Sequence, residues 1–288
     1  MPLTSLLLPL LLQVGFDPTR GAIPDYSAEV QDRPPRESSN IDAPEPTSWL
    51  SQCLAQVDED PARAHVQAQI RRDTIDGSER VYANHCLGLA STRLGRWEEA
   101  RAAFTAARQE TPPDDPRLRA RFGAMAGNAA LVTGDEAGAI ALLDAARADA
   151  IAAQAGSLQA LIALDRARAL VGVSELEAAQ ASLAEARDLQ PQDAETRLLL
   201  ATLLRRMERL PEAQAEIEEA GRLAPLDPAV GLEAGVIAML AGREAAARAS
   251  WQSVVGTDPQ SEEAQAAQRY LDQLGPAPER PAQEGPQP

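Results

Sequence analysis

Small and large apolar positions recur along this chain at fixed intervals. A Gly or Ala is followed by a turn residue after seven positions, an Ala after five more, a large apolar residue after four, a small residue after three and a Pro after five. The first clear copy consists of Gly88, Gly95, Ala100, Phe104, Ala107 and Pro112. Such a period predicts a stack of similar helix–turn–helix units.

Five copies of this pattern follow one another. They open at Gly88, Gly127, Ala167, Ala201 and Gly235, with separations of 39, 40, 34 and 34 residues. We assign the repeats to residues 81–119, 120–159, 160–193, 194–227 and 228–259. The small opening residue and the first Ala are expected to meet where two helices cross, and the large residue to fill the gap to the next pair. The Pro ends the second helix, because it lacks an N–H and restrains the residue before it.

Helical patterns also flank the five copies. Trp49, Leu50, Cys53, Leu54 and Val57 recur at helical spacing, and Asp60 followed by Pro61 is typical of an N-cap and the first residue of a second helix. Residues 47–80 are therefore predicted to form a degenerate helical hairpin, and residues 260–274 an amphipathic helix that caps the array. Residues 23–46 are Pro-rich and predict a disordered linker, as residues 275–288 predict a disordered tail.

The motif Leu87-Gly88, followed by Gly95-Arg96-Trp97-Glu98-Glu99-Ala100, Phe104, Ala107 and Pro112, resembles the consensus of the tetratricopeptide repeat. That family has a helix–turn–helix unit of about 34 residues. The resemblance extends over roughly residues 81–274, although Ser91 stands where the family often has Tyr. It implies an all-α fold, a right-handed superhelix (α-solenoid), in which the first helices line a concave groove for a protein or peptide.

Charge and composition exclude several classes of function. The chain has 27 basic and 43 acidic residues, a net charge of −16, and its basic residues are all Arg. An acidic protein is repelled by phosphate backbones, which argues against nucleic-acid binding. The lack of Lys excludes a Walker A loop and Schiff-base catalysis. No catalytic triad, Cys/His metal cluster or Gly-rich phosphate loop is evident, so we predict no enzyme activity, no cofactor and no metal.

Two features bear on the cellular compartment. Residues 3–12 form an apolar run that is too short to span a bilayer and matches the length of a secretory h-region, so residues 1–22 are a candidate signal peptide. No Arg or Lys precedes the run, and no good cleavage site follows it. We expect a periplasmic or secreted protein, with a cytoplasmic one as the alternative. Cys53 and Cys86 are either two buried apolar residues or one disulfide, depending on that compartment.

Candidate binding residues follow from the implied groove. Helical spacing places these side chains of the first helices on the groove side: Tyr82, His85, Leu89, Arg93, Arg121, Asn128, Arg168, Thr202, Arg205 and Arg206. The five Arg residues would form a positive strip suited to an acidic segment or a C-terminal carboxylate. Alternatively, they pair with neighbouring Asp and Glu residues and bind nothing. The two-carboxylate clamp of chaperone-binding members is not expected, because this chain has no Lys and carries His85 and Leu89 at the clamp positions.

The sequence as a whole predicts a non-catalytic interaction scaffold of the bacterial cell envelope that binds a protein or peptide in its groove. The alternative is a self-associating structural protein, or an accessory subunit of an envelope assembly. No segment after the N-terminal run is apolar enough for a transmembrane span.

Overall fold

A computed structural model describes residues 48–275, and this part of the chain consists of α-helices without strands. The predicted signal segment and linker, and the tail beyond Gly275, lie outside the described residues. In order, the helices are α3 (Ser48–Glu59), α4 (Pro61–Thr74), α5 (Ser78–Arg93), α6 (Trp97–Glu110), α7 (Pro116–Val132), α8 (Glu136–Ala152), α9 (Gly156–Gly172), α10 (Leu176–Leu189), α11 (Ala194–Arg206), α12 (Leu210–Leu223), α13 (Pro228–Leu240), α14 (Glu244–Thr257) and α15 (Glu262–Leu274).

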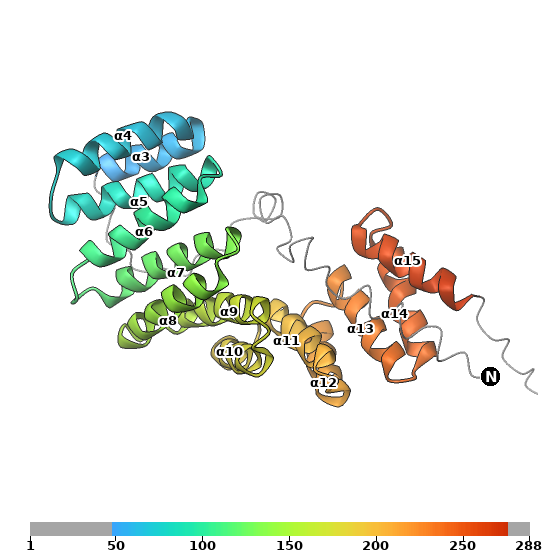
Figure 1. The fold of residues 1–288 in the computed structure, drawn as a ribbon. Helices are drawn as coiled ribbons and strands as arrows, with labels where there is room; N and C mark the ends of the chain where they lie inside the picture. Colours follow the sequence, from blue (N-terminus) through green and yellow to red (C-terminus); the bar gives the residue numbers. More distant parts are fainter. Residues whose placement is uncertain (1–47, 276–288) are drawn as a thin grey trace, which may run out of the picture.

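The helices form consecutive antiparallel hairpins that follow one another along a curved array (Figure 1). Each hairpin packs against the next, so that every helix contacts its neighbours in sequence. The first helices also contact each other, as α3 contacts α5, α7 contacts α9 and α13 contacts α15. They therefore form one layer, and α10 and α12 lie on the outer side of the curve (Figure 1). The described chain is an all-α helical-repeat solenoid.

The two helices of a hairpin approach most closely at the small residue that opens each repeat. A Cβ atom built on Gly235 would lie 2.1 Å from Nε1 of Trp251, and one built on Gly88 would lie 2.4 Å from Cε1 of Phe104. These distances are shorter than any van der Waals contact, so the wide aromatic rings require Gly opposite them. The Trp251 indole N–H also donates to the carbonyl of Leu232 at 3.1 Å, which holds the ring in place.

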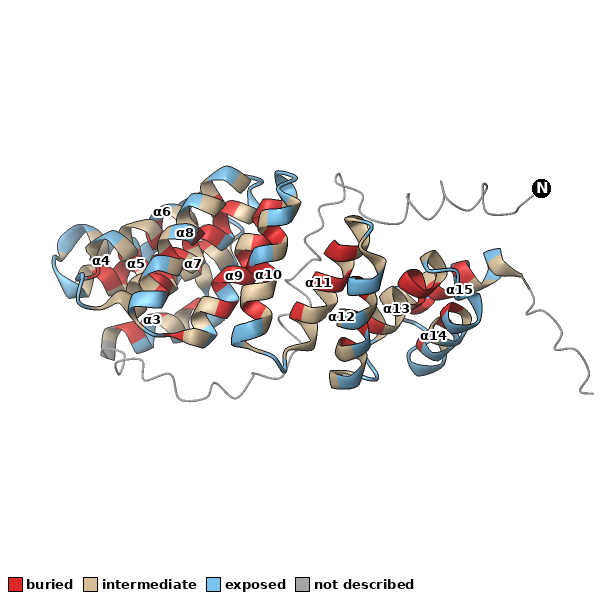
Figure 2. Ribbon diagram, turned by 90° about the horizontal axis from the view of Figure 1, so that it is seen from below, coloured by how far each residue is buried: buried red, intermediate tan, exposed pale blue. Residues whose placement is uncertain are grey.

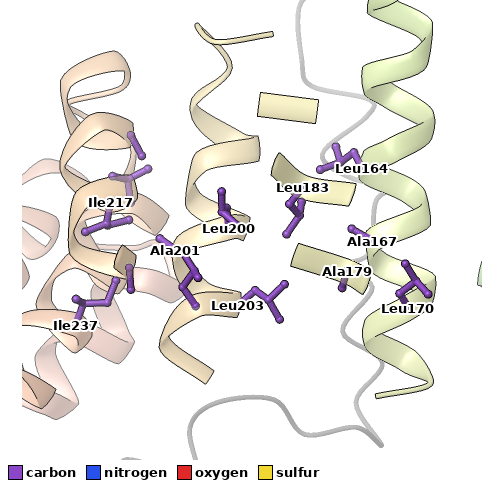
Figure 3. Packing of buried hydrophobic residues seen from close by; sticks show 14 residues of the cluster. Leu164, Ala167, Leu170, Ala179, Leu183, Leu200, Ala201, Leu203, Ile217 and Ile237 are labelled. Carbon is purple, nitrogen blue, oxygen red and sulfur yellow. The ribbon is translucent and has the colours of Figure 1, made fainter. Parts of the chain in front are cut away.

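The apolar core is continuous from one hairpin to the next. One cluster extends over α9, α10, α11, α12 and α13, and it includes Leu183, Leu200, Leu203, Ile217 and Ile237, which are at most 3% exposed (Figure 3). Buried residues lie between the helices, whereas exposed ones lie on their outer sides and in the turns (Figure 2). Burying one such side chain contributes about 1.5–3 kcal/mol. Each hairpin thus covers apolar surface that its predecessor leaves open.

The turns inside the hairpins use a left-handed backbone conformation. Gly95, Gly134 and Gly242 have φ angles of 69°, 73° and 74°, and Ser174 and Glu208 have 63° and 61° at the equivalent positions. A Cβ atom makes this conformation unfavourable by about 1–2 kcal/mol. The third and fourth repeats therefore keep the turn although they lack its preferred residue.

Arg side chains connect successive hairpins along the outer layer. The Arg101 guanidinium donates to Asp135 at 2.6 Å, and that of Arg147 to Glu185 at 2.9 Å. Arg187 donates to Glu216 at 2.7 Å. A guanidinium presents several donors in one plane and can therefore hold two acceptors at a junction, which an ammonium group cannot do with the same geometry. This structural use accounts for a large share of the basic residues.

A disulfide joins the first hairpin to the first clear repeat. Cys53 in α3 and Cys86 in α5 are bonded, with their Cα atoms 6.2 Å apart and both residues at most 2% exposed. The cysteines lie in an apolar cluster with Leu50, Val57 and Leu87. Of the two alternatives for these cysteines, the structure has the bridged one, and the bridge ties α3 directly to α5, the first helix of the next hairpin.

We predict that Gly235→Ala lowers the free energy of unfolding by about 1–3 kcal/mol, because the added methyl overlaps the Trp251 indole. In a Trp251→Ile background the same Gly235→Ala change should cost much less, since Ala201 and Ile217 occupy the same two positions in the preceding repeat. Urea unfolding followed by circular dichroism measures both variants. A Gly235→Ala protein as stable as the wild type would show that the indole moves aside without cost.

Replacing Cys53 and Cys86 together by Ser is expected to destabilise the first hairpin by about 3–4 kcal/mol, the loop-closure value for a separation of 33 residues. The loss should be local, because hairpins in a repeat array unfold partly independently. Hydrogen exchange of residues 48–93 measures it, with the reduced wild type as the matched control. Unchanged protection in both samples would contradict a stabilising bridge.

Candidate binding surface on the inner face

The first helices of the five repeats present equivalent positions on one face, which we call the inner face. Three rows of residues define it. In each repeat the first row lies six positions before the opening small residue, the second lies one position after it, and the third lies five positions after it. These positions are four or seven residues apart and therefore share one side of a helix. The rows are Tyr82, Arg121, Leu161, Glu195 and Ala229; Leu89, Asn128, Arg168, Thr202 and Val236; and Arg93, Val132, Gly172, Arg206 and Leu240. All of them except Val236 are at least partly exposed.

A polar network connects α7, α9 and α11 at the centre of this face. Arg168 donates to Asp165 at 2.6 Å and to Glu195 at 3.1 Å. Burial raises the pKa of Asp165, and this shift is opposed by the charge of Arg168 and by a hydrogen bond from Asn128. Two of the predicted groove residues, Arg168 and Asn128, are thus already engaged by an almost buried carboxyl group.

A second ion pair connects α11 and α13. Arg205 donates to Glu233 at 2.6 Å, and the two side chains are only 12% and 13% exposed. Burial lowers the pKa of the adjacent Arg206, and the charge of Arg205 lowers it further. At the other end of the face, Arg93 donates to Asp58 at 2.9 Å. Much of the positive charge predicted for this face is therefore compensated within the array.

His85 lies beside the same face but supplies no charge at neutral pH. Burial lowers its pKa to about 4, and the nearby positive charge of Arg121 acts in the same direction. Its ring packs edge-on against Phe122, with the ring centroids 5.1 Å apart. Tyr82 and Leu89 pack partly against the core that surrounds the disulfide. These three predicted site residues therefore contribute as much to packing as to the surface.

The part of the inner face formed by α7 and α9 offers the most open chemistry. Within residues 48–275, Arg121 takes part in none of the ion pairs. Leu161 and Val132 lie in the same rows and are 45% and 39% exposed. Asn128 is exposed on α7 between Arg121 and Val132 in the sequence. The α7 and α9 part of the inner face thus combines one cation with two exposed apolar side chains, while the Asn128 amide is held by Asp165.

Sequence reasoning missed the acidic partners on this face. Asp165 and Glu233 each stand two residues before the opening small residue of their repeats, and Glu195 stands six before it. The register of the repeats could have placed them there, because the same register placed the arginines. Asp165 engages Arg168 within α9, whereas Glu195 and Glu233 each engage an arginine of the preceding repeat, and only the structure shows these pairings.

Residues 48–275 also contain a cavity, but no metal-type cluster of side chains. Among residues 48–275 no three His, Cys, Asp or Glu side chains are grouped so as to hold a metal ion. A cavity of about 520 Å³ lies between α14 and α15, lined by Arg248, Gln252, Val255, Leu271 and Asp272 among others. Arg248 donates there to the carbonyl of Gly275 at 2.8 Å.

No helix in the described part is both long and apolar enough to cross a bilayer.

No family model and no curated protein matches this sequence. Solved structures do match the fold. PilW, described as a widely conserved type IV pilus biogenesis factor, has a TM-score of 0.61 and 18% identity over 76% of this chain and 96% of its own. MamA from Desulfovibrio magneticus RS-1 has a TM-score of 0.55 and 16% identity over 63% of this chain and 97% of its own. YrrB, described as a TPR protein with an unusual peptide-binding site, has a TM-score of 0.51 and 16% identity over 76% of this chain and 97% of its own.

Three observations indicate the same fold: the repeat register, the small residue at each helix crossing and these structural likenesses. The chain has the tetratricopeptide-repeat fold.

Proposed function

We propose that the protein is a non-catalytic scaffold that binds a protein or peptide along its inner face. The observation that carries this proposal is the alignment of partly exposed side chains in three rows over five successive first helices. A rigid, curved surface of this kind suits an extended ligand that contacts several repeats at once. YrrB has the same fold and is described as having a peptide-binding site, which supports the proposal.

The chemistry of the inner face favours a ligand with one acidic group flanked by apolar side chains. The carboxylate would pair with Arg121, since a guanidinium matches a carboxylate in geometry and charge. The apolar side chains would cover Leu161 and Val132, which are exposed on the same face. Arg168 and Arg205 are less suited to bind it, because each already holds a carboxylate of the array.

We also propose that the protein works in an exported compartment of a bacterial cell. The apolar run at residues 3–12 has the length of a secretory h-region. The disulfide between Cys53 and Cys86 supports the same conclusion, because disulfides persist in oxidising compartments such as the periplasm.

Arg121→Glu is expected to weaken binding of acidic peptides by about tenfold or more, because it removes an ion pair and adds like-charge repulsion. Fluorescence anisotropy with a set of labelled peptides that end in a free carboxylate next to apolar residues provides the measurement. Arg222→Glu makes the same charge change on α12, where Arg222 is 64% exposed on the outer layer, and should leave binding unchanged. Equal affinities of Arg121→Glu and wild type would rule out the proposed carboxylate contact.

Export is tested by fusing residues 1–47 to alkaline phosphatase without its own signal, which is active only after export. We expect activity, and we expect mass spectrometry of the native protein under non-reducing conditions to detect no free thiol. An inactive fusion together with two alkylatable cysteines would refute the exported location and leave the inner face as a cytoplasmic binding surface.

A further inference from the structure

The outer face of α4 differs from that of every other second helix in the array. When these helices are aligned on their N-cap residues, the position six residues after the cap is Val66 in α4. In the other five helices it is a small, exposed residue: Ala102, Ala141, Ala181, Ala215 and Ala249. The position ten residues after the cap is Ile70 in α4, and elsewhere Ala106, Ala145, Glu185, Glu219 and Ser253. Two bulky apolar residues thus stand where the repeat otherwise places small or polar ones.

The fold itself does not use these two side chains. Val66 is 57% exposed and Ile70 is 59% exposed, whereas Ala64 and Ala68 on the opposite side of α4 are fully buried against the array. Helix α4 belongs to the first hairpin, at the end of the array, and no other described helix lies over its outer side (Figures 1 and 2). Within residues 48–275 nothing covers this apolar pair, so it is available to another surface.

The charges beside the pair show what kind of surface would fit. Arg63, Val66, Ile70 and Asp73 are spaced three, four and three residues apart and therefore lie along one face of α4. Read in either direction, this row has a charge, two apolar residues and a charge of opposite sign. If a second α4 lies antiparallel across it, centred near Ala68, Arg63 faces Asp73 of the other copy. Val66 then faces Ile70, and both contacts occur twice.

We infer that the outer face of α4 is a self-complementary interface through which two copies of this chain associate about a two-fold axis. A two-fold interface requires that one patch match itself, and this row satisfies that condition in both charge and apolar character. Asp73 remains able to accept from the partner's Arg63, because it is 58% exposed and is contacted in the described chain by Arg72 at 3.3 Å through one oxygen. With a net charge of −16, two copies repel each other at long range, so their association depends on such local pairing.

This inference does not depend on the proposed inner-face function. The interface uses the outer side of the first hairpin and leaves the rows of the inner face open. A dimer would therefore present two inner faces, and a partner with two binding segments would be held more tightly than by either face alone.

The test is sedimentation velocity of the full-length protein over a wide concentration series. We expect a monomer–dimer equilibrium in the wild type. The double variant Val66→Ala with Ile70→Ala gives α4 the residues that α6 and α8 carry at these positions, so the fold should persist by circular dichroism. Its dimer should be weaker by about tenfold or more, because apolar contact area is lost on both copies.

Charge exchange provides a control that does not alter apolar area. Arg63→Glu alone and Asp73→Arg alone should each weaken the dimer, and the combined variant should restore it, since the pair is then reversed rather than broken. A wild type that stays monomeric at every concentration overturns the inference. Coverage of Val66 and Ile70 by residues 1–47 of the same chain would have this result. A dimer whose dissociation constant is the same in the wild type and in all of these variants also overturns the inference.

Discussion

The close approach of two helices at one small residue is the constraint on which the array depends. In the first and last repeats the contact is so tight that a single methyl group on Gly88 or Gly235 would overlap an aromatic ring. The third and fourth repeats have Ala at this position, facing Leu183 and Ile217, whereas the second keeps Gly127 against Leu143, where a Cβ would lie 2.6 Å from the Leu143 Cγ. The hairpin geometry set by this contact repeats along the chain, and it brings the first helices together as one inner layer.

Ion pairs between repeats form a second system that both supports the array and limits its binding chemistry. Arg205 and Glu233 are 28 positions apart in sequence, and their pairing joins two first helices on the inner face. If the same guanidinium bound a ligand instead, the carboxylate of Glu233 would stay buried without a partner, which costs free energy. The inner face is thus less positive than its Arg content suggests, and Arg121 differs from its neighbours by keeping its charge uncompensated within residues 48–275.

The fold could be predicted from the sequence because its determinants are local and repeated. The interval from Gly88 to Phe104, seen again from Gly235 to Trp251, encodes a helix crossing without reference to the rest of the chain. The candidate site could be predicted only in part. Helical register placed Arg168 on the inner face, but its capture by Asp165 depends on rotamers and on burial by α7 and α11. Likewise, the spacing of two cysteines left both a bridge and a buried pair as alternatives.

The two ends of the array are finished in different ways, and this difference bears on the outer face of α4. At the C-terminal end, α15 exposes polar residues such as Gln268, Arg269 and Asp272, which suits a surface in contact with water. At the N-terminal end, α4 exposes Val66 and Ile70, while the disulfide ties its hairpin to α5. Terminal hairpins fray most readily, and an interface built on one would lose affinity each time it opened. A covalent bond at this end therefore keeps an exposed apolar helix face in a fixed position, which is what association through that face requires.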